Sequence, residues 1–138
     1  MSRFPALTGL RFVPYVELLL VEEAAASSSE ICGLLAGALE RDRVGRVTAR
    51  IAVRNQSSRA HSFLVGLTQL CEARERLERS GLTLLAFYHS HPGGNPEPSY
   101  RDLEIPEVLQ LPSLIVAPGA RTVLNACGLY GREIRIVD

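Results

Sequence analysis

The chain has 138 residues, 46% of them hydrophobic, and its fifteen acidic and fifteen basic residues give no formal net charge. This balance argues against nucleic-acid binding as the main function, because such binding depends on an excess of positive charge. No apolar run approaches the roughly 20 residues of a membrane-spanning helix. We therefore expect one domain over residues 1–138, large enough for its own core, with no nucleic-acid or membrane partner.

The cysteines and the first residues predict the compartment. The start of the chain lacks the succession of basic stretch, apolar stretch and small-residue cleavage site that defines a signal peptide. The cysteines are widely spaced and odd in number, at Cys32, Cys71 and Cys127. This pattern fits a reducing environment better than a disulfide framework, so we expect a cytoplasmic protein.

The first half of the chain predicts a strand, a helix and two further strands. A short strand is expected over residues 10–13. Pro14 is expected to open a helix over residues 15–26, because its missing N–H costs nothing at the first helical position. A buried strand closed by Gly37 is expected over residues 31–36. An alternating, half-exposed strand over residues 46–54 then follows, antiparallel to it.

The second half predicts two helices and several strands. After a polar loop over residues 55–62, we expect a brief strand over residues 63–65. Apolar residues on one stripe predict a helix over residues 67–79, which Ser80 and Gly81 end. A buried strand is expected from Leu82 to Phe87. Ser99 is expected to cap a helix from Tyr100 to about Leu109. Three more strands are expected, over residues 114–117, 122–130 and 132–137.

About three helices and six to eight strands, often joined by short turns, result from this pattern. We therefore predict an α/β domain with a mixed, largely antiparallel sheet flanked by the helices.

The stretch YHSHPGGNPEPSYRD, Tyr88 to Asp102, has the residues of a metal site. If the preceding strand continues through His91, then His89 and His91 point to the same face with Cα atoms about 7 Å apart. Two imidazoles so placed can bind one Zn²⁺, and Asp102 would add a carboxylate oxygen. The fourth tetrahedral position stays open, which is typical of catalytic zinc sites. We predict one Zn²⁺ per chain, bound by His89, His91 and Asp102.

The full arrangement resembles the motif of the JAMM (MPN-plus, Mov34) metallopeptidases. That motif is an upstream Glu followed by His-x-His, seven residues, Ser, two residues and Asp. Ser99 and Asp102 stand at these offsets after His91, and Glu30 supplies the upstream acid. Glu30 lies in EICGLLAG, which resembles the family's first strand. The resemblance extends over the whole chain, to the small stand-alone prokaryotic type, and implies a cytidine-deaminase-like fold.

Each motif residue has a chemical interpretation. Glu30 as a fourth ligand would close the open position, so we interpret it as the general base that activates the zinc-bound water. The resemblance implies the same role. Ser99 would aim Asp102 through its cap, and the resemblance implies that it also donates a hydrogen bond to the oxyanion. A serine nucleophile is disfavoured, because no Gly-x-Ser-x-Gly elbow surrounds Ser99.

Three neighbouring residues are given non-catalytic interpretations. Ser90 should point to the opposite face and pack or form a supporting hydrogen bond. Cys32 shares a face with Glu30; we interpret it as a core residue, while proximity to the metal stays open. His61 is interpreted as an exposed loop histidine rather than a fourth ligand.

The resemblance also implies the substrate class. JAMM proteins hydrolyse the peptide or isopeptide bond after the C-terminal Gly-Gly of ubiquitin-like proteins or sulfur carriers. Such a tail would bind extended along a sheet edge, in a groove too narrow for a Cβ. Two alternatives stay open: a peptidase that trims a sulfur carrier's tail or releases cysteine, and a metal-free MPN scaffold. The identity of the partner, its leaving group and the formation of a homodimer also stay open.

Overall fold

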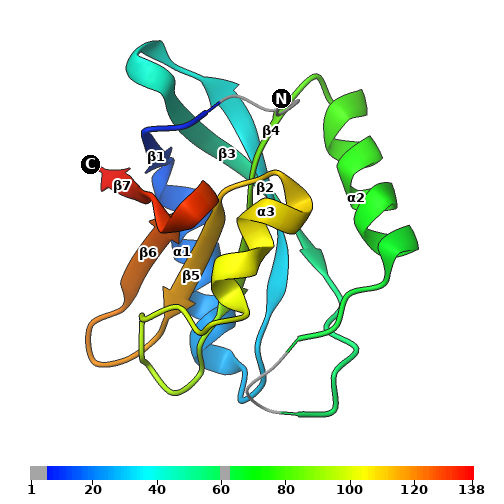
Figure 1. The fold of residues 1–138 in the computed structure, drawn as a ribbon, viewed down its shortest axis with the longest axis vertical. Helices are drawn as coiled ribbons and strands as arrows, with labels where there is room; N and C mark the ends of the chain where they lie inside the picture. The colour runs from blue at the N-terminus through cyan, green and yellow to red at the C-terminus, as the bar shows by residue number, and fades with distance from the viewer. Residues whose placement is uncertain (1–5, 60–62) are drawn as a thin grey trace.

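The computed structural model describes residues 6–59 and 63–138 (Figure 1). This part contains seven strands: β1 (Gly9–Phe12), β2 (Cys32–Leu39), β3 (Val44–Val53), β4 (Thr83–Ser90), β5 (Ser113–Ala117), β6 (Val123–Cys127) and β7 (Glu133–Val137). Its α-helices are α1 (Pro14–Ala26), α2 (Leu67–Arg79) and α3 (Ile105–Leu109). Short 3₁₀ helices η1 (Arg41–Arg43), η2 (Asp102–Glu104) and η3 (Leu129–Gly131) lie in the connections. In this part of the chain, no helix combines the length and apolarity that a membrane span requires.

The strands form one mixed sheet that closes on itself in the order β1-β3-β2-β4-β5-β6-β7. Four neighbouring pairs are antiparallel, and β1–β3, β1–β7 and β4–β5 are parallel. The mixed sheet was predicted, with a smaller antiparallel majority than expected. Its closure through β1, which pairs with both β3 and β7, was not predicted.

Helices cover both faces of the sheet. On one face, α1 buries Val16, Leu20 and Ala24 in a core cluster with residues of β1, β4, β5 and β7. On the other face, α2 and α3 cover a second cluster that includes Leu34 and Phe87 (Figure 1). The strands between the helices are therefore buried on both sides, as the six consecutive buried residues at the start of β2 show.

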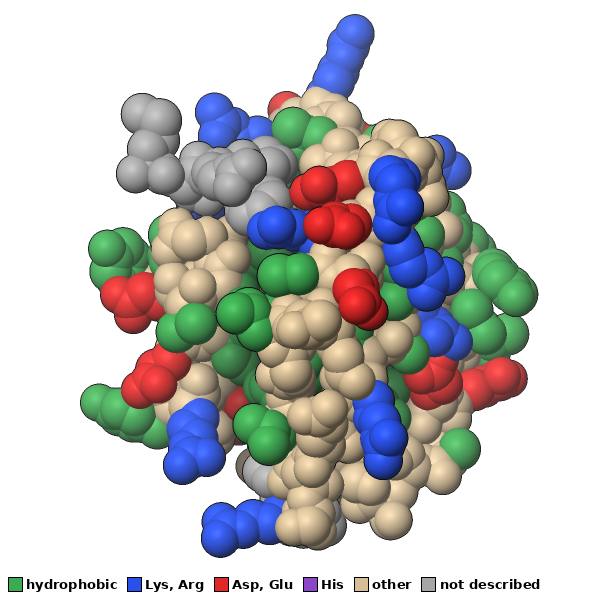
Figure 2. Space-filling model, turned by 90° about the vertical axis from the view of Figure 1, so that its right-hand side faces the viewer, with side chains coloured by type: hydrophobic (Ala, Val, Ile, Leu, Met, Phe, Trp, Pro, Cys, Tyr) green, Lys and Arg blue, Asp and Glu red, His purple; other side chains and the backbone are tan. Residues whose placement is uncertain are grey.

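The amphipathic pattern of α2 explains its position. Ala73 and Leu77 lie four residues apart, so they share one helical face and are buried against the sheet. The outward face exposes acidic and basic residues: Glu72, Glu75, Arg76, Glu78 and Arg79. Figure 2 shows this side of the molecule, where the two charge signs are interspersed.

Two expected strand positions differ from the structure in the first two thirds of the chain. β2 does not end at Gly37 but continues to Leu39, because a bulge between Ala36 and Gly37 lets its pairing with β3 continue. Residues 63–65 form no strand. The Leu64 N–H donates to the side chain of Asn55 rather than to a neighbouring strand.

Two further differences lie near the C-terminus. The helix expected from Tyr100 to Leu109 is divided into η2 and α3, because Pro106 has no N–H to donate to the preceding turn. The strand expected over residues 122–130 stops at Cys127. Tyr130 and Gly131 have φ angles of 59° and 72°, and they turn the chain back into β7.

Candidate metal centre

The end of β4 brings the predicted residues together. His89 lies opposite Cys32 in the antiparallel pairing of β2 with β4. The same register continues past β2: the Ser90 N–H donates to the Ile31 carbonyl at 3.0 Å, so Glu30 lies opposite His91. On the other side, the His91 N–H donates to the Val116 carbonyl at 3.0 Å. Both imidazoles are therefore held on fixed backbone, with the Glu30 carboxyl facing them.

Three side chains converge at hydrogen-bond distances. The Nε2 atoms of His89 and His91 are 3.2 Å apart. Asp102 places Oδ1 3.2 Å from His89 Nε2 and Oδ2 3.0 Å from His91 Nε2. A carboxylate oxygen of Glu30 and the ring nitrogens of both histidines lie within 4.8 Å of one another. These are the residues that the sequence predicted.

This donor set fits a bound Zn²⁺. Two imidazole nitrogens facing each other at 3.2 Å need a proton or a cation between them. With Zn–N bonds of about 2.0–2.1 Å, neighbouring ligand atoms of a tetrahedral site lie about 3.3 Å apart. The separations of 3.0–3.2 Å among His89, His91 and Asp102 are close to that spacing. The nitrogen and carboxylate donors are also types that zinc accepts.

Supporting contacts orient the ligand atoms. His91 Nδ1 lies 2.7 Å from the Asn95 carbonyl oxygen, so Nδ1 carries a proton and Nε2 is the ring nitrogen that a metal would bind. Asp102 and Ser99 exchange two bonds: the Ser99 N–H donates to Asp102 Oδ2 at 2.8 Å, and the Asp102 N–H donates to Ser99 Oγ at 3.2 Å. The predicted support of Asp102 by Ser99 is therefore present, at a 3₁₀ turn rather than a long helix.

Burial sets the protonation of the acids. Glu30 is only 7% exposed, and this burial raises its pKa to about 7; Asp102 adds to the rise and His91 opposes it. Burial also disfavours the charge of Asp102. The bonds from His89, His91 and the Ser99 N–H outweigh it and hold the Asp102 pKa well below its usual range. The bond to Asp102 raises the pKa of His91.

The convergent residues open into a cleft of about 440 Å³. Glu30, His91 and Asp102 line it, together with Phe63, Ser99 and the loop between His91 and Ser99. Part of the cleft is apolar, because Phe63 packs its ring 5.0 Å from the ring of His89. Carboxyl, imidazole and hydroxyl groups therefore line one cleft, at Asp102, His91 and Ser99.

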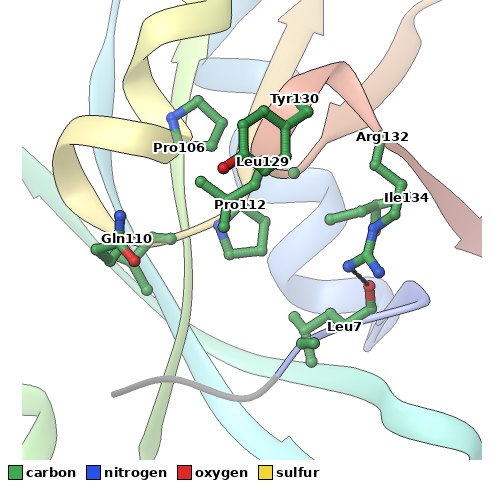
Figure 3. Close-up of a pocket in the computed structure, with 11 residues that line it drawn as sticks. Leu7, Pro106, Gln110, Pro112, Leu129, Tyr130, Arg132 and Ile134 are labelled. Atoms are coloured by element: carbon green, nitrogen blue, oxygen red, sulfur yellow. Dashed lines mark hydrogen bonds between the residues drawn. The ribbon is translucent and has the colours of Figure 1, made fainter. Parts of the chain in front are cut away.

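A second cavity, of about 280 Å³, shares no lining residue with this cleft. Figure 3 shows its mainly apolar wall, in which Arg132 donates a hydrogen bond to the Leu7 carbonyl at 2.9 Å. Its lining contains neither a histidine nor a carboxylate. The histidine cleft is therefore the candidate site for a metal, because it has both of these ligand types.

The supporting predictions have mixed outcomes. Ser90 has the expected supporting role, because its Oγ accepts the Ile31 N–H at 2.9 Å. Cys32 is a buried core residue, as interpreted, and burial raises the pKa of its thiol to about 12. His61 lies outside the described residues.

The contributions of Asn55, Phe63 and Asn95 were not predicted. Asn55 binds the Glu30 carbonyl, and Phe63 packs on His89. In the sequence these three residues are marked only by their position in loops next to strands, and ordinary turn residues have the same position. Asn95 acts through its backbone carbonyl, which no sequence pattern reveals.

Several known proteins are similar to this chain. A probable TtuB-protein conjugate cleaving protease from Thermus thermophilus is 40% identical over 98 residues, which are 67% of this chain and 62% of that protein. A desampylase from Pyrococcus furiosus is 31% identical over 85 residues, 62% of this chain and 57% of that protein. The deubiquitinase MYSM1 from Homo sapiens is 34% identical over 91 residues, 64% of this chain and only 11% of that longer protein. The match thus spans less than two thirds of the length of each of these relatives.

The fold also has a solved counterpart. The solution structure of protein DSY2949 from Desulfitobacterium hafniense superposes with a TM-score of 0.77 at 22% identity. The match covers 93% of this chain and 91% of that one. The model of a family described as prokaryotic homologs of the JAB domain matches residues 13–127, which include Glu30, both histidines, Ser99 and Asp102. The resemblance to the small prokaryotic JAMM proteins is thereby confirmed, and the chain belongs to the family of prokaryotic homologues of the JAB domain.

Proposed function

We propose that this protein is a zinc-dependent peptidase that hydrolyses the peptide or isopeptide bond after the C-terminal Gly-Gly of a ubiquitin-like protein or sulfur carrier. The main support is the convergence of His89, His91 and Asp102 within 3.0–3.2 Å, with the buried Glu30 carboxyl beside them. The names of the relatives, which describe cleavage of TtuB conjugates, desampylation and deubiquitination, support the substrate class.

In this proposal His89 Nε2, His91 Nε2 and an oxygen of Asp102 hold one Zn²⁺. When bound, zinc lowers the pKa of a water molecule to about 7 and polarises a carbonyl. The protein keeps His91 in the ligating tautomer through the Asn95 carbonyl, and it keeps Asp102 in place through Ser99.

Glu30 is the proposed general base. Its carboxylate takes a proton from the attacking water and returns it to the leaving nitrogen. In the metal-free site burial raises the Glu30 pKa to about 7, and a bound cation would favour the ionised carboxylate that a general base requires.

Ser99 is the proposed donor to the oxyanion. Its Oγ accepts the Asp102 N–H, and its own hydroxyl hydrogen remains available to a group in the cleft. Removal of one such donor typically costs on the order of 10²–10³ in rate.

Two further expectations remain part of the proposal. The three cysteines are all free, which supports a cytoplasmic location. The relation of this mixed sheet to the cytidine-deaminase fold also stays a prediction.

The test is hydrolysis of a defined conjugate. The probe is TtuB joined through its C-terminal carboxyl to the ε-amine of a lysine in a fluorescent peptide. We expect the zinc-loaded protein to release the peptide, and mass spectrometry to place the cut after Gly-Gly. Removal of zinc by a chelator should abolish release, and zinc addition should restore it. Release that continues unchanged in the chelated protein would contradict the proposal.

A matched substrate tests the groove. Replacing the last tail glycine with alanine should slow cleavage at least tenfold, about 1.4 kcal/mol in the transition state. Two further substrates distinguish deconjugation from tail processing: a linear fusion after Gly-Gly, and a carrier with a C-terminal cysteine. Their cleavage rates are compared with the rate on the isopeptide. Faster release from either of these than from the isopeptide would favour the sulfur-carrier alternative.

A further inference from the structure

We propose that Asn55 is a positioning residue for Glu30, an inference that rests on the proposed function. Asn55 follows the end of β3 and is half-buried. Its Nδ2 donates to the backbone carbonyl of Glu30 at 2.8 Å. It therefore binds the main chain of the residue whose carboxylate moves the proton.

The register of the sheet explains why this bond is needed. The pairing of β2 with β3 ends at Cys32 and Val53. Continued two residues further, that register would place Glu30 opposite Asn55, where the chain of β3 has left the sheet. The Asn55 side chain thus binds the Glu30 carbonyl at a position where the strand pairing has ended. On the opposite side, Ser90 binds Ile31 through its Oγ and N–H, so Glu30 is held between β3 and β4.

The orientation of the Asn55 amide follows from its partners. The Glu30 carbonyl only accepts hydrogen bonds, so it must meet Nδ2. The N–H groups of Ser57 and Leu64 only donate, and both lie 2.9 Å from Oδ1. These contacts with Glu30, Ser57 and Leu64 agree with one assignment, and the flipped amide would oppose each of them.

The nitrogen and the oxygen of the Asn55 amide bind two different segments that line the cleft. Nδ2 holds Glu30, while Oδ1 holds Leu64, the residue after Phe63. The Phe63 ring packs 5.0 Å from His89 and 5.4 Å from Phe87. One side chain therefore links the position of the general base to the apolar wall over a ligand histidine.

This division suggests a substitution that breaks one link and keeps the other. Asn55→Asp retains an oxygen for the N–H groups of Ser57 and Leu64. It replaces the Nδ2 donor with a second oxygen, which repels the Glu30 carbonyl. Asn55→Ser is a second variant, because its short hydroxyl can close the local turn but cannot reach Glu30.

The experiment is a double-mutant cycle with Glu30→Gln. Release of the fluorescent peptide from the TtuB conjugate is measured in the zinc-loaded single and double variants. We expect Asn55→Asp to lower kcat ten- to a hundredfold and to change KM less than twofold, because a misplaced base slows the reaction without loosening binding. In the Glu30→Gln background, the same change should alter the residual kcat less than twofold.

Two measurements besides turnover accompany the cycle. Zinc affinity, determined by competition with a chromogenic chelator, should change less than twofold in Asn55→Asp, because no ligand atom bonds to Asn55. Far-ultraviolet circular dichroism should show an unchanged fold. Gln110→Glu is the matched control: it alters an exposed amide that donates to the Glu107 carbonyl, outside the cleft, and should leave kcat unchanged.

The outcomes separate this inference from the proposed function. An inactive Glu30→Gln with fully active Asn55→Asp and Asn55→Ser would overturn the positioning role alone. An equal loss from Asn55→Asp in both backgrounds would also overturn it, because the residue would then act independently of Glu30. Full activity of Glu30→Gln would overturn both. If Asn55→Asp does not fold, Asn55→Ser takes its place in the double-mutant cycle. It should likewise lower kcat in the wild-type background and leave the residual kcat of Glu30→Gln nearly unchanged.

Discussion

At the scale of single residues, two acids in one site have opposite protonation behaviour. Asp102 accepts bonds from two histidines and a backbone N–H, so its charge is compensated. Glu30 is equally buried but lies outside this network, and its pKa rises to about 7. An acid with compensated charge suits a metal ligand, while an acid with a raised pKa suits proton transfer.

The Glu30→Gln variant tests this division of roles. Glutamine has nearly the same shape but cannot take a proton from water, so kcat should fall by about 10²–10⁴. Zinc content, measured by atomic absorption, should stay close to one per chain, because the ligand atoms are untouched. The contrasting variant is His89→Ala, which should lose the metal as well as the activity. Zinc loss in Glu30→Gln would instead make Glu30 a ligand.

The sequence predicted the residues with distinctive chemistry and missed those that act through ordinary groups. His89, His91, Ser99 and Asp102 stand at spacings that rarely occur by chance, and the structure brings them together with Glu30. An asparagine after a strand has no comparable signal. The contact of Asn55 with Glu30 depends on the register of two strands, which is fixed only in the folded sheet.

At the scale of elements, prediction succeeded where both ends of an element have clear signals. Helix α2 has the predicted bounds, because Gly66 precedes its amphipathic stretch and Ser80 with Gly81 follow it. Gly37 was misinterpreted as an end, although its role is to allow a close approach. A Cβ at Gly37 would overlap the Arg46 carbonyl oxygen of β3 at the bulge. A glycine can end a strand or allow two strands to approach closely, and the sequence alone does not distinguish these two roles.

The Gly37→Ala variant tests the bulge. The added methyl group meets backbone, which cannot rotate away as a side chain can, so β2 and β3 must separate locally. We expect the free energy of unfolding to fall by about 2–4 kcal/mol, measured by urea denaturation. Gly119→Ala is the matched control, because its nearest atom would be the Arg121 carbonyl oxygen at an ordinary 3.8 Å. Equal stability of the two variants would show that the bulge tolerates a side chain.

At the scale of the whole molecule, the closed sheet places the site where several elements end. β4 contributes His89, and His91 directly follows its end. The segment before β2 contributes Glu30, and η2 contributes Asp102. Closure depends on β1 pairing with β3 and β7, which are far apart in sequence. Such long-range pairing leaves no local pattern, and it was therefore the part of the fold that the sequence did not predict. Because Glu30 and Asp102 are buried where these elements end, the stability of the fold depends on their protonation.

This coupling predicts the pH dependence of the metal-free protein. The pKa of Asp102 is lowered in the folded state, so its contribution to stability is present above about pH 4 and is lost as the pH falls. The pKa of Glu30 is raised from 4.5 to about 7, so the folded state loses stability across that interval as the pH rises. The raised pKa of His91 acts in the same direction: its contribution is present below its ordinary value of 6.5 and is lost at higher pH. The metal-free protein should therefore be most stable near pH 5, between these two losses.

Urea denaturation of the chelated protein between about pH 3 and pH 8 measures this profile. We expect the free energy of unfolding to decline by about 1–3 kcal/mol from pH 5 to pH 8. In Glu30→Gln the decline should become smaller, because the neutral amide has no charge to bury. In the zinc-loaded protein it should disappear, since a cation between the histidines favours both neutral imidazoles and an ionised Glu30. A metal-free protein whose stability rises steadily from pH 5 to pH 8 would show that the buried carboxyl of Glu30 does not control the profile.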